Sequence, residues 1–141
     1  GGVCAKPHRA VKGVFAMKIP TICEYCGCKV IFTDSAIVYG KSYGMIYLCT
    51  NCNAYVGTHK GSKKPLGTLA NTVLRMKRKQ AHRAFDTIWK TQGISRSDAY
   101  EWLAERMELP KHRTHIGYFN VEQCDRVIEI CHGRKNEQEA A

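Results

Sequence analysis

The sequence contains no apolar run approaching the roughly 20 residues that a membrane-spanning helix needs, so we expect no membrane partner. It also contains no segment that combines a basic start, an apolar core and a small-residue cleavage site, which is the pattern of a secretory signal. We therefore expect a cytoplasmic protein. In a reducing compartment, the eight cysteines indicate metal binding rather than a set of disulfides.

Acidic residues are scarce, with 12 Asp and Glu against 22 Lys and Arg and a formal net charge of +10. The shortage is greatest in residues 55–90, which hold nine basic residues and one acidic residue. A surplus of one sign on this scale favours polyanionic partners. The 44% of hydrophobic residues is otherwise ordinary, and 141 residues suffice for one domain, or for one domain with a small metal-dependent lobe.

Residues typical of a catalytic centre are also missing. Residues 27–48 contain no histidine, although a zinc-supported nuclease with a catalytic hairpin usually carries one between its cysteine pairs. No pair of carboxylates lies near a histidine at ligand spacing, and the glycine-rich segment 57–67 does not have the spacing of a P-loop. We therefore expect no enzymatic activity. The alternative is a metal-assisted nuclease, whose candidate residues are His59, His82, Asp86 and His115.

Two Cys-x-x-Cys pairs, Cys23 with Cys26 and Cys49 with Cys52, form the strongest pattern in the sequence. Each pair brings two sulfurs onto one tight turn, and two facing turns provide the four thiolates of a tetrahedral Zn²⁺ site. Four protein ligands leave no open position for water or substrate, so we expect one structural zinc ion. The alternatives are two disulfides or free core cysteines, and Cys28 is a competing candidate ligand.

Short runs rich in β-branched and aromatic residues predict strands between and after the cysteine pairs. The predicted strands are residues 29–33, 36–39, 45–48 and 54–56. A turn with glycine at both ends, at 40–44, predicts a hairpin of the second and third strands. A hairpin between two cysteine turns is the arrangement of a zinc ribbon, which we place at residues 18–57.

Tyrosines are concentrated in the same lobe, at positions 25, 39, 43, 47 and 55. We expect them to supply the small core of the ribbon, with their hydroxyls at the surface. The alternative is that they stack on unpaired bases, because basic residues lie beside them in the sequence.

A polar, glycine-rich basic loop follows at residues 58–67. Glycines let backbone amides approach a phosphate and lysines neutralise its charge, so we expect Lys60, Lys63 and Lys64 to bind nucleic acid. The alternative is a solvated linker between two lobes.

Thr68 is a candidate N-cap for a helix that runs to Trp89 and ends before Gly93. The apolar residues that recur at helical spacing are Leu69, Val73, Met76, Ala81, Ala84, Phe85 and Ile88. The other face of this helix is basic. Like charges at neighbouring positions of a helix repel one another, so a face of positive charge alone favours binding of an external anion over an ordinary solvated face. We expect the stripe to bind nucleic acid through Arg75, Arg78, Lys79, His82 and Arg83.

Two cap signatures predict two further helices. Ser95 with Asp98 begins the first, and Asn120 with Gln123 begins the second, which is expected to end near Gly133. The fold class is therefore α+β, with the zinc-ribbon lobe followed by a three-helix region.

The helical region is expected to span residues 68–132, with disordered segments at 1–17 and 133–141. Cys124 and Cys131 lie two turns apart on the apolar face of the last helix. We expect them to be core residues, and the alternative is a second metal site.

A set of short strings runs through residues 18–131: Cys23-x-x-Cys26-Gly27, Tyr39-Gly40, Tyr43-Gly44, Cys49-x-x-Cys52-x-Ala54-Tyr55-Val56-Gly57-x-His59, Pro65-Leu66-Gly67-Thr68-Leu69-Ala70, Ala99-Tyr100-x-Trp102-Leu103-Ala104 and His115-Ile116-Gly117. Together these strings resemble a zinc-finger-containing domain family of bacteria and bacteriophages, a family of unassigned function. The resemblance implies zinc at the two cysteine pairs and supplies no activity. Residues 1–16 lie outside it.

The expected function is that of a nucleic-acid-binding module for DNA or RNA. In this interpretation the ribbon fixes one end of the basic loop, and the long helix lays its basic face along a phosphate backbone. The alternative is a protein-interaction module, such as a phage or host-factor adaptor, whose tyrosines and basic helix meet an acidic protein surface.

Overall fold

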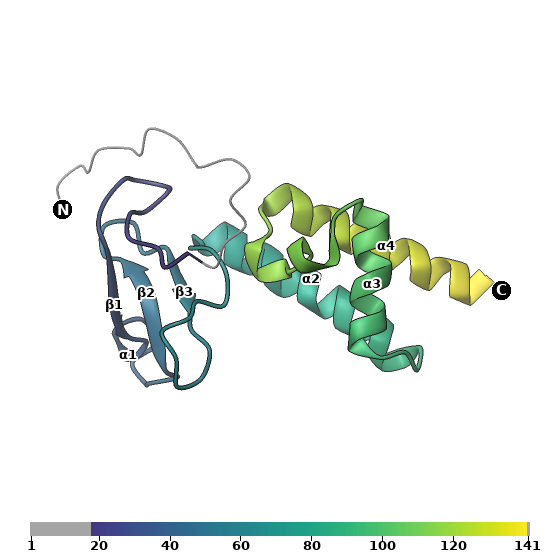
Figure 1. The fold of residues 1–141 in the computed structure, drawn as a ribbon, viewed down its shortest axis with the longest axis horizontal. Coiled ribbons are helices and arrows are strands. Elements are labelled where there is room, and N and C mark those ends of the chain that lie inside the picture. Colours follow the sequence, from purple (N-terminus) through teal and green to yellow (C-terminus); the bar gives the residue numbers. More distant parts are fainter. Residues whose placement is uncertain (1–17, 141) are drawn as a thin grey trace. The chain divides into compact units, whose positions relative to one another are not determined.

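The computed structural model describes the chain from residue 18 to residue 140, the last three by their backbone alone. The chain divides after Thr72 into two compact units. We call residues 18–72 the ribbon unit and residues 73–140 the helical unit; Figure 1 shows the sheet of the first and the helices of the second. The α+β class is confirmed. The extension predicted at 1–17 lies outside the described residues.

The ribbon unit contains a three-stranded antiparallel sheet in the order β1-β2-β3. Its strands are β1 (Val30–Asp34), β2 (Met45–Cys49) and β3 (Tyr55–Gly57). In the register of the sheet, Phe32 on β1 lies opposite Tyr47 on β2. The central strand β2 therefore carries a cysteine of the second pair, Cys49, at its end, and Tyr47 in its middle forms a cross-strand aromatic pair with Phe32.

Residues 36–39 form a single helical turn, α1 (Ala36–Tyr39), and the strand predicted there is wrong. The Asp34 carboxylate accepts a 2.8 Å hydrogen bond from the backbone N–H of Ala36, which starts the turn. Gly40, with φ of 74°, ends it in the left-handed region. These local bonds outweigh the strand propensity of the β-branched residues between them, so β2 pairs with β1 instead.

The core of the ribbon unit is small and rich in sulfur. Tyr47 of β2 and Val56 of β3 lie in it beside three of the cysteines. The full set of buried residues is Cys23, Cys28, Val30, Tyr47, Cys49, Ala54, Val56 and Leu69, with Cys26 and Cys52 packed against them. So few apolar side chains do not stabilise an isolated lobe of this size without a further cross-link.

The first long helix, α2 (Thr72–Thr91), begins later than predicted, so Thr68 is not its N-cap. Leu69 is buried in the ribbon core, and Ala70 exchanges two 3.0 Å backbone hydrogen bonds with Tyr55 of β3. The first backbone N–H groups of a helix lack partners within the helix, whereas pairing with the edge strand β3 satisfies the backbone of Ala70. This explains why α2 begins only at Thr72. The pattern of burial shifts with it: Val73 and Met76, predicted in the core, are 59% and 57% exposed.

The helical unit also contains α3 (Arg96–Met107) and α4 (Val121–Ala140). Both predicted caps are present: the Ser95 hydroxyl accepts from the Asp98 N–H at 3.0 Å, and Asn120 and Gln123 bond each other reciprocally. Helix α4 continues past Gly133 to Ala140, so the predicted end of this helix is wrong. The largest buried side chains of the unit are Phe85, Ile88, Leu103, Ile116, Phe119 and Val127.

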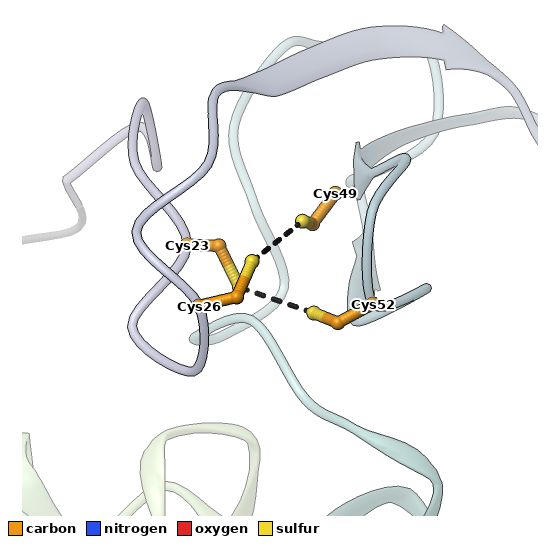
Figure 2. A group of neighbouring side chains, drawn as sticks. All are labelled: Cys23, Cys26, Cys49 and Cys52. Atoms are coloured by element: carbon orange, nitrogen blue, oxygen red, sulfur yellow. Dashed lines mark hydrogen bonds between the residues drawn. The ribbon is translucent and has the colours of Figure 1, made fainter. Parts of the chain in front are cut away.

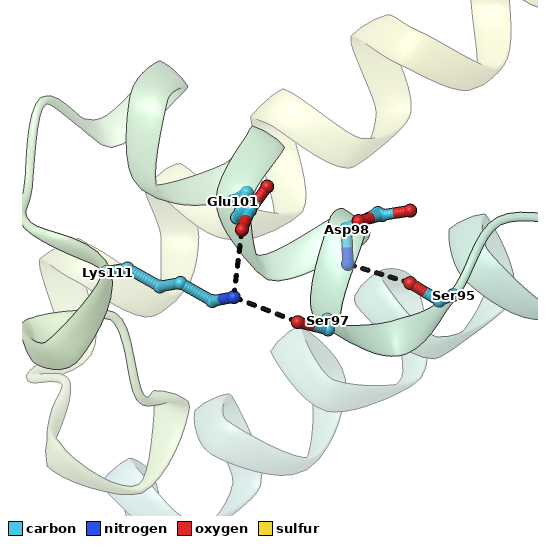
Figure 3. A network of polar contacts seen from close by, with 5 residues as sticks. All are labelled: Ser95, Ser97, Asp98, Glu101 and Lys111. Atoms are coloured by element: carbon cyan, nitrogen blue, oxygen red, sulfur yellow. Dashed lines mark hydrogen bonds and ion pairs between the residues drawn. The ribbon is translucent and has the colours of Figure 1, made fainter.

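Two short 3₁₀ turns, η1 (Lys111–Arg113) and η2 (Ile116–Tyr118), connect α3 to α4. Figure 3 shows how the first is held: the Lys111 ammonium donates to the Ser97 hydroxyl at 2.9 Å and to the Glu101 carboxylate at 3.1 Å. The connection is thereby fixed against the first turns of α3. Within the described residues, no helix is both long and apolar enough to cross a membrane.

Candidate metal centre

Two turns of the same design present the four cysteines of the ribbon unit. In the first, the Gly27 N–H donates to the Cys23 carbonyl at 2.8 Å, and in the second the Asn53 N–H donates to the Cys49 carbonyl at the same distance. Gly27 and Asn53 both have positive φ, of 78° and 64°, directly after the second cysteine of each pair. A left-handed residue at this position reverses the chain, so both sulfurs of a pair lie on one side of the turn.

The four sulfurs converge on one point, as Figure 2 shows. All four Sγ atoms lie within 4.8 Å of one another. The distance from Cys23 Sγ to Cys52 Sγ is 3.3 Å, and that from Cys26 Sγ to Cys49 Sγ is 3.4 Å. A tetrahedral zinc site with bonds of about 2.3 Å has sulfurs roughly 3.8 Å apart, so the set fits a Zn²⁺ ion.

Burial opposes ionisation of part of this set. It raises the pKa of Cys23 to about 12 and raises the pKa of Cys49 as well. By contrast, hydrogen bonds from the Cys28 backbone and the Asn51 side chain lower the pKa of Cys26 to about 6. A cysteine binds zinc as the thiolate, so the positive charge of a bound cation has to favour ionisation of the buried Cys23 and Cys49.

The other described cysteines lie outside the cluster. Cys28 is buried in the ribbon core but does not belong to the group of four sulfurs. Cys124 and Cys131 are buried core residues of the helical unit, as predicted, and burial raises their pKa values to about 11 and about 12. Among the side chains that the structure describes, at residues 18–137, no other group of three or more potential ligands of the types His, Cys, Asp and Glu gathers within ligand distance.

The basic loop is ordered by bonds to its own residues and to the sheet, unlike a solvated linker. Thr58 and Pro65 form an isolated bridge, and inside it the His59 N–H donates to the Lys64 carbonyl at 2.9 Å. The Tyr47 hydroxyl donates to the Lys63 carbonyl at 2.6 Å. The three predicted nucleic-acid-binding lysines of the loop, Lys60, Lys63 and Lys64, are all exposed.

The residues of the basic stripe predicted on α2 differ in their exposure to solvent. Lys79 and Arg83 are exposed, and Arg75 is half-buried. Arg78 is only 8% exposed, and its Nε donates to the Phe119 carbonyl at 3.0 Å, so its side chain is not on the surface where a nucleic-acid contact needs it.

The position of Arg78 could have been read from helical spacing. It lies four residues after Leu74 and three before Ala81, which are both buried. His82 is half-buried, with Nδ1 3.0 Å from the Arg78 carbonyl, and burial lowers its pKa. Arg78 is therefore buried and His82 is only partly accessible, whereas the prediction placed both on an exposed face.

Two of the candidate nuclease residues, Asp86 and His115, have side-chain contacts within the helical unit. The Asp86 carboxylate accepts a 3.0 Å hydrogen bond from Trp89 Nε1 on the same helix. The ring of His115 lies 6.3 Å from that of Tyr100 and 6.4 Å from that of Tyr118. His59 is exposed in the basic loop.

Two aromatic residues beside the basic loop were not recognised as site residues from the sequence. Phe32 and Tyr43 line a groove together with the loop segment from Thr58 to Lys63. Phe32 was assigned to a strand, and Tyr43 was expected to contribute to the core, but both are exposed. The signal in the sequence is the concentration of tyrosines beside basic residues, for which stacking on unpaired bases is the alternative interpretation.

Comparison with known proteins gives one result. The model of a zinc-finger-containing domain family matches residues 19–134 of the chain. Searches of curated proteins and of solved structures returned no significant match.

Proposed function

The chain belongs to this family of zinc-finger-containing domains, and from that premise we propose that it is a nucleic-acid-binding module held together by one structural Zn²⁺ ion. Cys23, Cys26, Cys49 and Cys52 fill all four coordination positions of a tetrahedral ion. The ion therefore stabilises the ribbon unit and leaves binding to the surface around it. The proposal assigns no catalytic residue.

The observation that carries the proposal is the uncompensated charge of the basic loop. Lys60, Lys63 and Lys64 are exposed, and none of them forms an ion pair within the described residues. The described part of the ribbon unit holds two carboxylates. One of them, Asp34, already accepts hydrogen bonds from the Ala36 N–H and the Ser42 hydroxyl. An external polyanion is the natural counter-charge for such a loop.

The tip of the loop is shaped for close approach. Gly61 has φ of 70°, a conformation that L side chains rarely adopt, so this position carries no Cβ between the neighbouring lysines. A phosphate can therefore approach the backbone between Lys60 and Lys63. In the helical unit, the exposed Lys79 and Arg83 offer a further contact of the same kind.

The test is binding of the zinc-loaded full chain to labelled single-stranded DNA, duplex DNA and RNA, followed by fluorescence anisotropy. A triple variant with Lys60, Lys63 and Lys64 changed to Gln is compared with a matched variant in which Lys18, Lys29 and Lys90 are changed to Gln. Both lose three charges. We expect the loop variant to bind at least about tenfold more weakly, and the control to bind within about threefold of the unchanged protein.

Two results would count against the proposal. Equal weakening by both variants would show attraction to net charge alone and no built contact surface. Absence of binding to all three probes at low salt would remove the nucleic-acid function altogether.

A second candidate function is a protein-interaction module, and one observation favours it. Helix α1 exposes apolar side chains on consecutive residues: Ile37 is 60% exposed, and Val38 and Tyr39 are exposed as well. Exposed apolar clusters of this kind often mark protein-binding sites. Recovery of one stoichiometric protein partner after nuclease treatment, lost when Ile37 is changed to Ser, would favour this function over the first.

A further inference from the structure

The ribbon unit contains a groove of about 620 Å³, which is within the range of roughly 300–1,000 Å³ that ligand sites occupy. One wall is formed by the basic loop from Thr58 to Lys63, and the other by Phe32, Tyr43 and Met45 of the sheet and its connection. None of the lining residues is acidic. The groove thus combines aromatic surface with positive charge.

Tyr43 is a highly exposed aromatic side chain of the groove, with 72% of its surface open to solvent. Its backbone is nevertheless fixed. The Tyr43 N–H donates to the hydroxyl of the buried Ser35 at 2.7 Å, and the Ser35 N–H donates to the Gly44 carbonyl at 2.9 Å. The ring packs edge-on against Tyr39, with ring centroids 5.6 Å apart. An exposed aromatic ring on a fixed backbone loses little conformational freedom when a ligand binds it.

Phe32 supplies a second aromatic surface at the groove. Its ring lies 5.0 Å from that of Tyr47, centroid to centroid, and 37% of its surface is exposed. Phe32 belongs to the same face of the sheet as Val30, two residues earlier, but it lies where the buried core has ended. The Lys63 ammonium is 5.8 Å from the centre of the Phe32 ring, so charge and aromatic surface lie directly beside each other.

We propose that this groove binds single-stranded nucleic acid, with an unpaired base stacked on Tyr43 beside Phe32 and the adjoining phosphates at Lys60 and Lys63. The inference rests on the proposed function and specifies its ligand. A phosphate chain alone accounts for the lysines but leaves two exposed aromatic rings without a role. A base has an apolar face for those rings, and its backbone has the charge for the loop.

Duplex nucleic acid does not fit the same surface. In a duplex, both faces of an interior base are covered by its neighbours, so an aromatic ring reaches it only after unstacking, which costs a few kcal/mol. Sequence preference is expected to be weak because every base has a π-face. The distinguishing property is therefore the strandedness of the ligand.

The experiment uses the zinc-loaded full chain and three probes of about 12 nucleotides, a length within the usual site size of single-strand binders. The probes are an intact single strand, the same strand with abasic sites at its centre, and a duplex. Each is titrated against the unchanged protein, Tyr43→Leu and Tyr43→Phe. Because Tyr43 is exposed, neither change removes core packing, and zinc content and the melting temperature verify the fold of each variant.

We expect the intact strand to bind at least about fivefold more tightly than the abasic strand or the duplex, since stacking of a base contributes about 1–3 kcal/mol. Tyr43→Leu should lose the same factor on the intact strand and lose nothing further on the abasic strand. Tyr43→Phe should bind like the unchanged protein, because it keeps the ring. The same pattern with single-stranded RNA supports the inference equally.

The contrary results separate the two proposals. If the abasic strand or the duplex binds as tightly as the intact strand, and Tyr43→Leu changes nothing while the triple lysine variant still loses binding, the groove is not a base site and the general function stands. If no probe binds at low salt, the general function fails, and the inference about the groove fails with it.

Discussion

The hydroxyl of Tyr47 donates a 2.6 Å hydrogen bond to the backbone carbonyl of Lys63. Tyr47 is buried in the ribbon core two residues before Cys49, and Lys63 is exposed in the basic loop. One side chain thus connects the strand that carries a metal ligand to the loop that carries the charge. We infer that the shape of the loop depends on the order of the sheet, and through the sheet on the metal site.

Changing Tyr47 to Phe removes this connection and keeps the ring in the core. We expect the ribbon unit to lose about 1 kcal/mol in its free energy of unfolding, the net value of a typical hydrogen bond. We also expect a few-fold weaker affinity for nucleic acid, because the loop is less well ordered. Thermal unfolding and anisotropy measure the two effects. Tyr55→Phe is the matched control, since the Tyr55 hydroxyl bonds that of Tyr39; equal affinities for the two variants would contradict the prediction.

Changing Cys49 to Ser should abolish binding of one zinc ion and unfold the ribbon unit, because the sulfur core is too small to fold alone. Both tryptophans, Trp89 and Trp102, belong to the helical unit, so their fluorescence should change little. Elemental analysis gives the zinc content, and NMR reports on each unit separately.

The matched control for the zinc prediction is Cys131→Ala, which removes a buried sulfur outside the cluster. We expect this variant to keep one zinc ion and to destabilise the helical unit instead. A Cys49→Ser protein that retained one zinc ion and an intact sheet would refute the assignment of the ligands.

The metal centre could be predicted from sequence because its information is local. Each pair of cysteines forms its own turn, and the four ligands can be recognised from these two short motifs without information about the rest of the chain. The caps at Ser95 and Asn120 were predictable for the same reason, since each is complete within four residues.

The errors arose where distant residues compete for a segment. Helical spacing favoured a start near Leu69, but the edge of β3 takes Ala70 into a backbone pair. Arg78 looks like one member of a basic stripe, but it lies on the buried face of α2 with Leu74 and Ala81, where the distant Phe119 carbonyl accepts a hydrogen bond from its Nε. Neither partner is visible from the local pattern. The groove beside Tyr43 was missed for a related reason, since its two walls are separated in the sequence.

Arg78 and Arg83 lie on the same helix and should have opposite roles. Changing Arg78 to Gln should lower the free energy of unfolding of the helical unit by roughly 2 kcal/mol, because it removes a hydrogen bond from a buried charged group. Its affinity for nucleic acid should be unchanged under conditions where it is folded. Arg83→Gln should leave stability within about 0.5 kcal/mol and weaken binding. A stable Arg78→Gln protein with reduced affinity would restore Arg78 as a contact residue.

The dependence of binding on salt should reveal how many phosphates the loop neutralises. Each neutralised phosphate of a single strand adds about 0.7 to the slope of log K against log salt concentration, so three loop lysines contribute roughly 2. We therefore expect the Lys60, Lys63 and Lys64 triple Gln variant to show a slope flatter by about 2, and the control variant at Lys18, Lys29 and Lys90 to keep the original slope. Titration of a single strand between about 50 and 200 mM salt measures both. An unchanged slope in the loop variant would mean that its lysines do not contact phosphate, whatever the loss of affinity, because counterion release depends on charges in contact and not on net charge.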